Sequence, residues 1–341
     1  MFNRSTQLHA QDSVAAQIVK LGADAFQKAK APGLLVATLR NGKTDSYLWG
    51  YADSAQQKRF DLQIRFEAAS ITKTFTAFVV AKVLAQKNIA DTASILPYLP
   101  DSLQQNKALS SISFLSLLNH TSGLPRLPDN FKPANPAQPY ADYSVDRLFA
   151  YLKTAVPKPN GKSNYSNTGA ALAGVLAQRL SGKTFPELLH HYIYKPFGII
   201  IPRRGTKIQQ AKGYMDKQPV DYWKWDAFEP TGGIQCSAHQ LLQYLHYLDK
   251  PKNKKEAAFI NHFLQPTVRI NPTVQVARGW HTLEKKGKPV VYWHNGGTYG
   301  FSTFAAFVPG TGKAVVVVAN KFDVNEVSDK LGFDVLYTLL Q

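Results

Sequence analysis

Ser70 and Lys73 are the first residues in this chain whose types and spacing could do chemistry. The run Phe66–Ala77 places them as Ser-x-x-Lys at the start of an apolar helix. Three residues make most of a helical turn, so the two side chains lie on one face within reach of each other. A serine hydroxyl becomes a good nucleophile when a neighbouring base takes its proton, and a lysine is such a base only when neutral. The positive end of the helix dipole and burial both disfavour the ammonium form of Lys73.

The residues around this pair distinguish two interpretations. A serine that caps a helix, followed by a solvated lysine, would give the same spacing without any chemistry. Ala68 and Ala69 are small, as a crowded site needs. The helix beyond them leaves little polar surface on which to expose a lysine, because it carries Phe75, Phe78, Val79, Val80, Val83 and Leu84. A lysine among apolar residues is rare without a purpose, so the sequence favours a nucleophile and its base.

Tyr165 and Asn167 form a second candidate pair. They follow the Pro/Gly turn 157–161 and precede the helical run Ala170–Leu180. A phenol can relay a proton when nearby cations lower its pKa from about 10. The amide of Asn167 offers both a donor and an acceptor. The alternative is a turn tyrosine that only packs on the core.

The third candidate is the run His294–Gly297, at the end of a predicted strand. Its two glycines would let a substrate backbone approach closely and could present a bare N–H group to an oxyanion. The alternative is a bulge or a tight turn in an edge strand.

Other chemistries find less support. The chain has no Gly-x-Ser-x-Gly elbow of an α/β-hydrolase, and neither His-Glu-x-x-His nor Cys-x-x-Cys to suggest a metal.

The predicted elements divide the chain into two lobes. An amphipathic helix over Asp12–Lys30 precedes two β-rich runs, Leu34–Leu39 and Thr44–Tyr51, joined by Asn-Gly, which is a strong hairpin signal. The middle of the chain, about 70 to 200, is mostly helical. Strands return in the last quarter and a helix over Asp329–Leu340 closes the chain; the strands are Gly279–Leu283, Val290–His294, Ser302–Val308 and Lys313–Ala319. Strands at both ends with helices between them predict a discontinuous α/β lobe and a helical lobe, with a site between them.

Composition describes an ordinary globular protein of 341 residues, with a formal net charge of +17. The charge indicates either attraction to an anionic surface such as a cell-wall polymer or plain solubility. No nucleic-acid motif accompanies the scattered basic residues, so we expect no nucleic-acid partner.

The single Cys236 excludes an intrachain disulfide and is expected to be a buried thiol. The apolar runs are too short to span a bilayer, and no secretory signal is visible at the N-terminus. These features leave the cellular location open, cytoplasm included.

Taken in order, the three motifs resemble those of the penicillin-recognising serine hydrolases, in the branch of class C β-lactamases and D-Ala-D-Ala carboxypeptidases. The resemblance covers about Pro32 to Leu340 and includes the run Leu117–Pro125. It implies a β-lactamase/transpeptidase-like α/β (α+β) fold, in which an antiparallel sheet is flanked by terminal helices. We expect one catalytic unit over 12–341, with an α/β lobe over about 12–69 and 260–341 and a helical lobe over about 70–259. The resemblance also implies that the protein is periplasmic or secreted, as members of this family usually are.

The resemblance also implies a role for each motif residue. Ser70 would form an acyl-enzyme, and Lys73 and Tyr165 would share the general-base and general-acid work. Asn167 would bind the substrate amide and help to hold Lys73. The N–H groups of Ser70 and Gly297 would form the oxyanion hole. The remaining substrate contacts would come from His294, Gly296 and Thr298. No metal or organic cofactor is implied.

One departure bears on the substrate. Class C β-lactamases usually carry Lys-Thr-Gly where this chain has His294-Asn295-Gly296. A histidine is only partly charged near pH 7, so it holds a substrate carboxylate less strongly than a lysine does. The resemblance therefore implies a serine hydrolase acting on D-alanyl peptides or other amides, or on β-lactams with only weak hydrolysis. The alternatives are a family VIII-like carboxylesterase for short acyl esters and a non-catalytic wall-binding or sensor protein.

Overall fold

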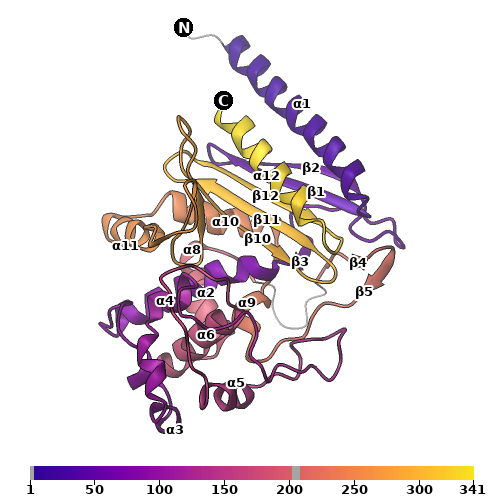
Figure 1. Cartoon of the computed structure of the whole chain (residues 1–341). Helices are drawn as coiled ribbons and strands as arrows, with labels where there is room; N and C mark the ends of the chain where they lie inside the picture. Colours follow the sequence, from indigo (N-terminus) through magenta and orange to yellow (C-terminus); the bar gives the residue numbers. More distant parts are fainter. Residues whose placement is uncertain (1–3, 202–207) are drawn as a thin grey trace.

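An antiparallel sheet forms the centre of the molecule (Figure 1). The computed structural model describes residues 4–201 and 208–341. The strands lie in the order β2-β1-β12-β11-β10-β9-β8-β7, so the two ends of the chain supply neighbouring strands. Their bounds are β1 Gly33–Arg40, β2 Lys43–Gly50, β7 Val268–Arg269, β8 Val274–Val276, β9 His281–Leu283, β10 Val291–Gly297, β11 Ser302–Val308 and β12 Lys313–Ala319. The predicted antiparallel sheet is confirmed.

The hairpin between β1 and β2 follows from its two turn residues. Asn41 and Gly42 both have positive φ, at 52° and 79°, as a two-residue turn that matches the strand twist requires. Arg40 pairs with Lys43 across the turn, and the pairing runs on to Gly33 and Gly50. The Asn-Gly signal therefore sets the register of the first two strands.

The central strands are apolar on both faces because both faces are covered. In β1, Leu34 and Val36 pack on one side, while Leu35 and Ala37 pack on the other. Helices α1 (Arg4–Ala29) and α12 (Asn325–Leu340) lie side by side over the first face (Figure 1). Helix α10 (Ala238–Asp249) covers the opposite face. A strand buried on both sides is a continuous apolar run, and β12 has the same character.

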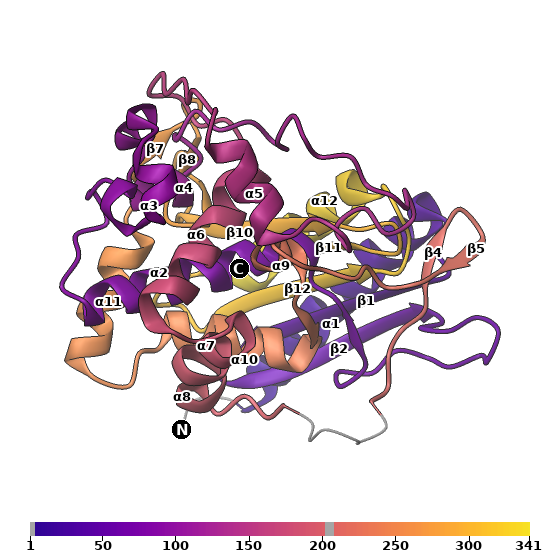
Figure 2. The ribbon, with the colours of Figure 1, turned by 90° about the horizontal axis from the view of Figure 1, so that it is seen from below.

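A mostly helical lobe lies beside the sheet (Figure 2). Its central helix is α2 (Thr72–Gln86), which packs against α6 (Asn167–Ser181) and α9 (Glu229–Gly232). Most residues of α2 are buried, as its apolar sequence predicts. Around these helices lie α3 Asp101–Gln104, α4 Phe114–Leu118, α5 Val145–Leu152, α7 Phe185–Leu189, α8 Lys195–Phe197 and α11 Lys254–Leu264. Two short pairs of strands complete the described chain, β3 Arg65–Glu67 with β6 Gln235–Ser237 and β4 Gly213–Met215 with β5 Gln218–Val220.

Some details differ from the sequence analysis. Helix α10 lies within the range assigned to the helical lobe, yet it packs on β1, β11 and β12 of the sheet. Strands β7 and β8 and helix α11 were not predicted. The two strands contain only two and three residues, too few for an alternating pattern to be visible. Their assignment depends on the pairing of β7 with β8 and of β8 with β9, which is a tertiary contact.

Cys236 is buried and free, as expected. Burial raises the pKa of its thiol to about 12, so the thiol is uncharged at neutral pH. Within the described ranges, no helix combines the length and the apolar character needed to cross a membrane.

Candidate active site

Ser70 lies at a sharp turn between β3 and α2. It occupies a short 3-10 helix, Ala69–Ile71, that leads directly into α2. Ala69 has φ of 50°, a left-handed conformation that costs a non-glycine residue about 1 kcal/mol or more. Ser70 itself is half-buried. The strained residue before it holds the serine at the start of the helix with its hydroxyl accessible.

Lys73 is buried one turn after Ser70, with 3% of its surface exposed. Its Nζ lies 3.1 Å from Ser70 Oγ and donates to the carbonyl oxygen of Thr231 at 2.7 Å. Burial, and then the charge of Arg126, lower the pKa of Lys73 well below its usual value. A neutral amine can donate one N–H to Thr231 and keep its lone pair for the Ser70 proton. This geometry suits a general base.

Tyr165 forms a hydrogen bond with Ser70. Its ring centroid lies 5.0 Å from Lys73 Nζ and 4.6 Å from the His120 ring centroid. Burial raises the pKa of Tyr165 to about 12, against the lowering effects of the Ser70 bond and the Arg126 charge. The phenol is therefore protonated at neutral pH and can donate a proton.

The turn that carries Tyr165 is held by the start of α6. Ser166 caps this helix by accepting from the Gly169 N–H at 2.9 Å. The Ser166 N–H donates to His120 Nδ1 at 3.2 Å. The N–H groups of Asn167 and Thr168 both donate to the carbonyl of Arg126, at 3.0 and 3.3 Å. The run Leu117–Pro125 thus supports Tyr165 through His120.

The end of β10 passes close to the Ser70 turn. A Cβ atom at Gly296 would lie 2.5 Å from the Ala68 carbonyl oxygen and 2.8 Å from Ala69 Cβ, so only glycine fits there. Asn325 of α12 donates to the Gly296 carbonyl at 2.9 Å. Gly297 then lines the same cavity as Ser70. The chain thus brings the third motif to the nucleophile through a close backbone approach.

These segments surround a cavity of about 530 Å³. Its walls come from both lobes and consist of Ser70, Arg126, Tyr165, Trp223, His281, Trp293, Asn295, Gly296, Gly297, Phe322, Asp323 and Asn325. No group of three or more His, Cys, Asp or Glu in the described part of the chain is arranged to hold a metal ion.

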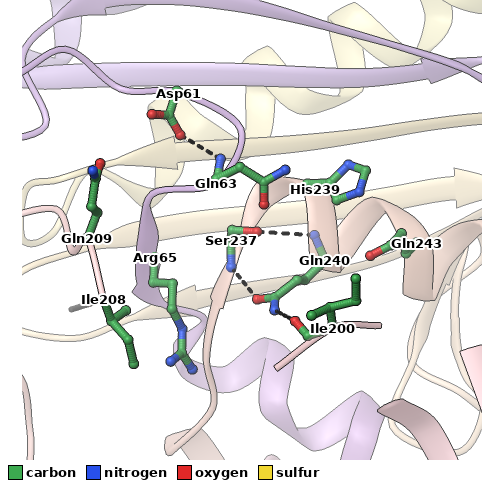
Figure 3. Close-up of a pocket in the computed structure, with 10 residues that line it drawn as sticks. All are labelled: Asp61, Gln63, Arg65, Ile200, Ile208, Gln209, Ser237, His239, Gln240 and Gln243. Carbon is green, nitrogen blue, oxygen red and sulfur yellow. Dashed lines mark hydrogen bonds between the residues drawn. The ribbon is translucent and has the colours of Figure 1, made fainter. Parts of the chain in front are cut away.

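A second cavity of about 480 Å³ lies near β3 and β6 (Figure 3). Its polar groups bond mainly to one another. Ser237 and Gln240 bond reciprocally as a helix cap, and Gln240 Nε2 donates to the Ile200 carbonyl. Asp61 accepts from the Gln63 N–H. The Ser237 hydroxyl is engaged as a helix cap, and the hydrogen bonds found for it among the described residues include none to a base, so the Ser70 cavity is the candidate active site.

Comparison with known proteins identifies the family of the whole chain. The model of the Beta-lactamase family matches residues 14–337, nearly the whole chain. The chain belongs to the Beta-lactamase family. Its fold and its broad resemblance are therefore confirmed.

The relatives of this beta-lactamase-family protein are distant. A beta-lactamase of Escherichia coli (strain K12) is 24% identical over 337 residues, covering 87% of this chain and 86% of that protein. A beta-lactamase of Pseudomonas fluorescens is 26% identical, covering 87% of this chain and 90% of that protein. A protein named unguisins hydrolase ungD' from Aspergillus campestris (strain IBT 28561) is 25% identical, covering 91% of this chain and 61% of that protein. The proteins similar to this chain therefore include one that is not named a beta-lactamase.

His294 does not line the cavity, contrary to the role expected from its motif. It is 1% exposed, and its ring lies behind the wall, 5.3 Å from His281 and 6.4 Å from Tyr165 between ring centroids. Burial, the largest cause, lowers the pKa of His294 well below its usual value. His294 is therefore neutral, and it cannot serve as a cationic anchor for a carboxylate.

Two other predicted contacts also differ. Thr298 is buried, and its hydroxyl donates to Glu67 at 2.8 Å, so it supports the loop after β10 instead of facing substrate. The hydrogen bonds found for Lys73 Nζ go to Ser70 and Thr231 and not to Asn167. Asn167 Oδ1 is buried without a partner among the described residues. The partners of Thr298, Lys73 and Asn167 depend on packing, which the sequence motifs do not specify.

The cavity also contains residues that the sequence analysis did not single out. Arg126 directly follows the run Leu117–Pro125, and that position was an available signal. Trp223 and Asn325 lie in segments without a recognisable motif. Thr231, which fixes the Lys73 amine, acts through its backbone carbonyl, a group that every residue type offers.

Proposed function

We propose that this protein is a serine hydrolase that transfers an acyl group to water through an acyl-enzyme on Ser70. The observation that carries this proposal is the buried Lys73 amine, 3.1 Å from Ser70 Oγ at a cavity that Tyr165 also lines. We further propose D-alanyl peptides or related amides, β-lactams included, as the substrate class. Membership of the Beta-lactamase family supports the reaction type.

The proposed reaction begins when Lys73 takes the Ser70 proton and the serine oxygen attacks the substrate carbonyl carbon. The resulting oxyanion accepts from the N–H groups of Ser70 and Gly297, donors of a kind worth about 3 to 4 kcal/mol in related acyl transfers. The bond to the leaving group then breaks, and the Tyr165 phenol protonates that group. The Lys73 ammonium returns a proton to Tyr165. Water finally attacks the acyl carbon and releases Ser70.

A covalent-labelling experiment tests the proposal. A fluorescent penicillin or an activated ester should form an adduct that mass spectrometry locates on Ser70. The Ser70→Ala variant should show neither label nor turnover while keeping its melting temperature. Absence of any adduct on Ser70, together with no turnover of amides or esters, would falsify the proposal.

A carboxylesterase for short acyl esters is the second candidate function. The neutral, buried His294 favours it, because the third motif then supplies no charge for a substrate carboxylate. Rates with nitrocefin, p-nitrophenyl butyrate and a D-Ala-D-Ala peptide separate the two candidates. A large excess of ester turnover with the peptide untouched would reverse our ranking.

A non-catalytic wall-binding or sensor role is the third candidate, and the net charge of +17 is its support. In that case Ser70→Ala should bind an anionic wall polymer as well as the wild type does. A location in the periplasm or outside the cell also stays a prediction, and fractionation of the native cells checks it.

A further inference from the structure

The active-site cavity needs a cation if the substrate carries a carboxylate, and the third motif does not provide one. His294 is buried behind the wall. His281 lines the cavity, but burial lowers its pKa to about 4, so it is neutral. Lys73 is buried, and its amine is engaged by Ser70 and Thr231. Among the described residues that line the cavity, Arg126 is the one fixed positive charge.

Arg126 is held in place by its backbone while its side chain stays available. Its carbonyl accepts the N–H groups of Asn167 and Thr168, which ties it to the turn that carries Tyr165. Its guanidinium lies 5.4 Å from the centroid of the Tyr165 ring. The residue is exposed, and its side chain forms no ion pair or hydrogen bond with any other described residue. An arginine placed in this way can use its planar set of donors on a ligand.

The other residues of the cavity wall indicate on which side of the cavity a substrate carboxylate can lie. Asp323 lies on the loop between β12 and α12, so a carboxylate on that side would meet repulsion, whereas Arg126 belongs to the helical lobe. Trp223 and Phe322 supply apolar walls. The Trp223 indole Nε1 is buried without a partner in the described part of the chain, which leaves a second donor in a residue of the wall.

We propose that Arg126 binds a carboxylate of the substrate and thereby takes over the anchoring role that the third motif lacks. The substrate class is then an ester or amide that carries an anionic group, bound by Arg126 while the substrate carbonyl lies at Ser70 Oγ. An apolar portion of the substrate would pack against Trp223 and Phe322. A guanidinium and a carboxylate form paired, charge-assisted hydrogen bonds, which fix orientation as well as adding affinity. This inference rests on the proposed acyl-transfer function.

Matched ester pairs test the assignment. One pair is the 4-nitrophenyl monoester of glutaric acid and its methyl ester, in which the charge lies on the acyl chain. The other pair is 3-carboxyphenyl butyrate and its methyl ester, in which the charge lies on the leaving group. For each pair, the ratio of kcat/KM for the charged over the uncharged ester cancels any general damage to Lys73 or Tyr165. The wild type should favour the charged member in at least one pair.

Arg126→Gln should lower that ratio about 10- to 100-fold, the range expected for losing hydrogen bonds to a charged group. Arg126→Lys should restore part of it, because the charge remains but the paired geometry does not. Arg179→Gln is the matched control, since Arg179 is an exposed arginine on α6 outside the cavity. It removes the same charge and should leave the ratio unchanged.

The possible failures are distinguishable. An unchanged ratio in Arg126→Gln, or an equal fall in Arg179→Gln, would overturn the role of Arg126 while Ser70-dependent turnover upholds the proposed function. No preference for the charged ester in either wild-type pair would overturn it as well. Absence of Ser70-dependent turnover with every ester and amide would contradict the proposed function itself, and this inference with it.

Discussion

At the scale of single residues, burial assigns opposite protonation states to the two candidates for proton transfer. Burial disfavours the charged form of each group, so it lowers the pKa of Lys73 and raises that of Tyr165 to about 12. The lowered pKa favours a neutral amine that can accept a proton, and at neutral pH the phenol still has one to donate. We had expected the two residues to share both roles, and their pKa shifts favour Lys73 as base and Tyr165 as acid.

The pH dependence of kcat/KM follows from this assignment. Activity should be lost on the acid side, as Lys73 becomes protonated at a pH well below 10.5. It should persist on the alkaline side until Tyr165 ionises near pH 12. A pH–rate profile with an ester substrate from about pH 5 to about pH 10 checks both limbs. Activity that rises only as the pH approaches 10.5 would show that Lys73 is charged at neutral pH, contrary to our assignment.

Glu67 should limit stability above neutral pH. Its carboxylate accepts from the Trp223 N–H and from the Thr298 hydroxyl, and burial raises its pKa to about 7. A raised carboxyl pKa means that stability is fully present below the unfolded value of about 4.5 and is lost as the pH rises through about 7. Glu67→Gln should therefore raise the free energy of unfolding at pH 8, by at most about 3 kcal/mol.

The same substitution should have a smaller effect near pH 5, where the wild-type carboxyl is already protonated. Urea unfolding at the two pH values measures the difference. Glu284→Gln is the control, because that carboxylate is half exposed and lies 4.0 Å from Arg269. An equal gain from Glu67→Gln at both pH values would count against a titrating carboxylate.

At the scale of elements, the close approach of β10 to the Ser70 turn determines how the oxyanion site is built. Thr303 Oγ1 donates to the Ala68 carbonyl at 3.1 Å and thereby links β11 to the same turn. The absence of a side chain at Gly296 lets the strand lie against Ala68 and Ala69. The position of the Gly297 N–H therefore depends on contact between two elements.

Gly296→Ala should separate these elements. Its Cβ would clash with the Ala68 carbonyl and with Thr303 Oγ1, at 2.5 and 2.7 Å, so we expect a loss of stability of about 1 to 3 kcal/mol. A displaced oxyanion donor should also lower kcat by about 10²-fold or more. Thermal unfolding and ester kinetics measure the two effects. For stability, Gly297→Ala is the control, because its Cβ would meet only the end of the Asn325 side chain, at 3.0 Å; an equal fall in melting temperature for both variants would contradict the clash.

At the scale of the whole molecule, the site depends on how the two lobes are joined. Arg278, between β8 and β9, pairs with Asp91 at 2.6 Å, and both side chains are largely buried. Arg278 also donates to the His262 carbonyl at 2.7 Å. The neighbouring Gly279 N–H donates to the Leu118 carbonyl in the helical lobe. These contacts fix the sheet edge against the helices that carry the motif residues.

Arg278→Leu should destabilise the protein by about 3 to 5 kcal/mol, because Asp91 would keep a buried charge without its partner. Urea unfolding measures the loss. The double variant Arg278→Leu/Asp91→Leu should be more stable than Arg278→Leu alone, since no charge is then left unpaired. A cost below about 1 kcal/mol for the single variant would mean that the pair behaves like an exposed one.

The sequence by itself indicated some of the residues that meet at the site, Ser70, Lys73 and Tyr165 among them, and much of the sheet. Ser70 and Lys73 are adjacent because helical spacing is local, and Asn41-Gly42 sets a hairpin because few residues adopt positive φ. The long apolar strands β1, β11 and β12 were readable because a continuous or alternating pattern needs several residues to show. The short strands β7 and β8 offered no such pattern.

Only the tertiary structure decided what each motif residue faces. His294 had the expected position in the chain, but packing behind the cavity wall made it neutral and removed it from the substrate surface. The Thr298 hydroxyl donates a hydrogen bond to Glu67, and Arg126 lines the cavity. Burial and charge depend on contacts between segments far apart in the sequence, and a local pattern of residue types carries no record of those contacts.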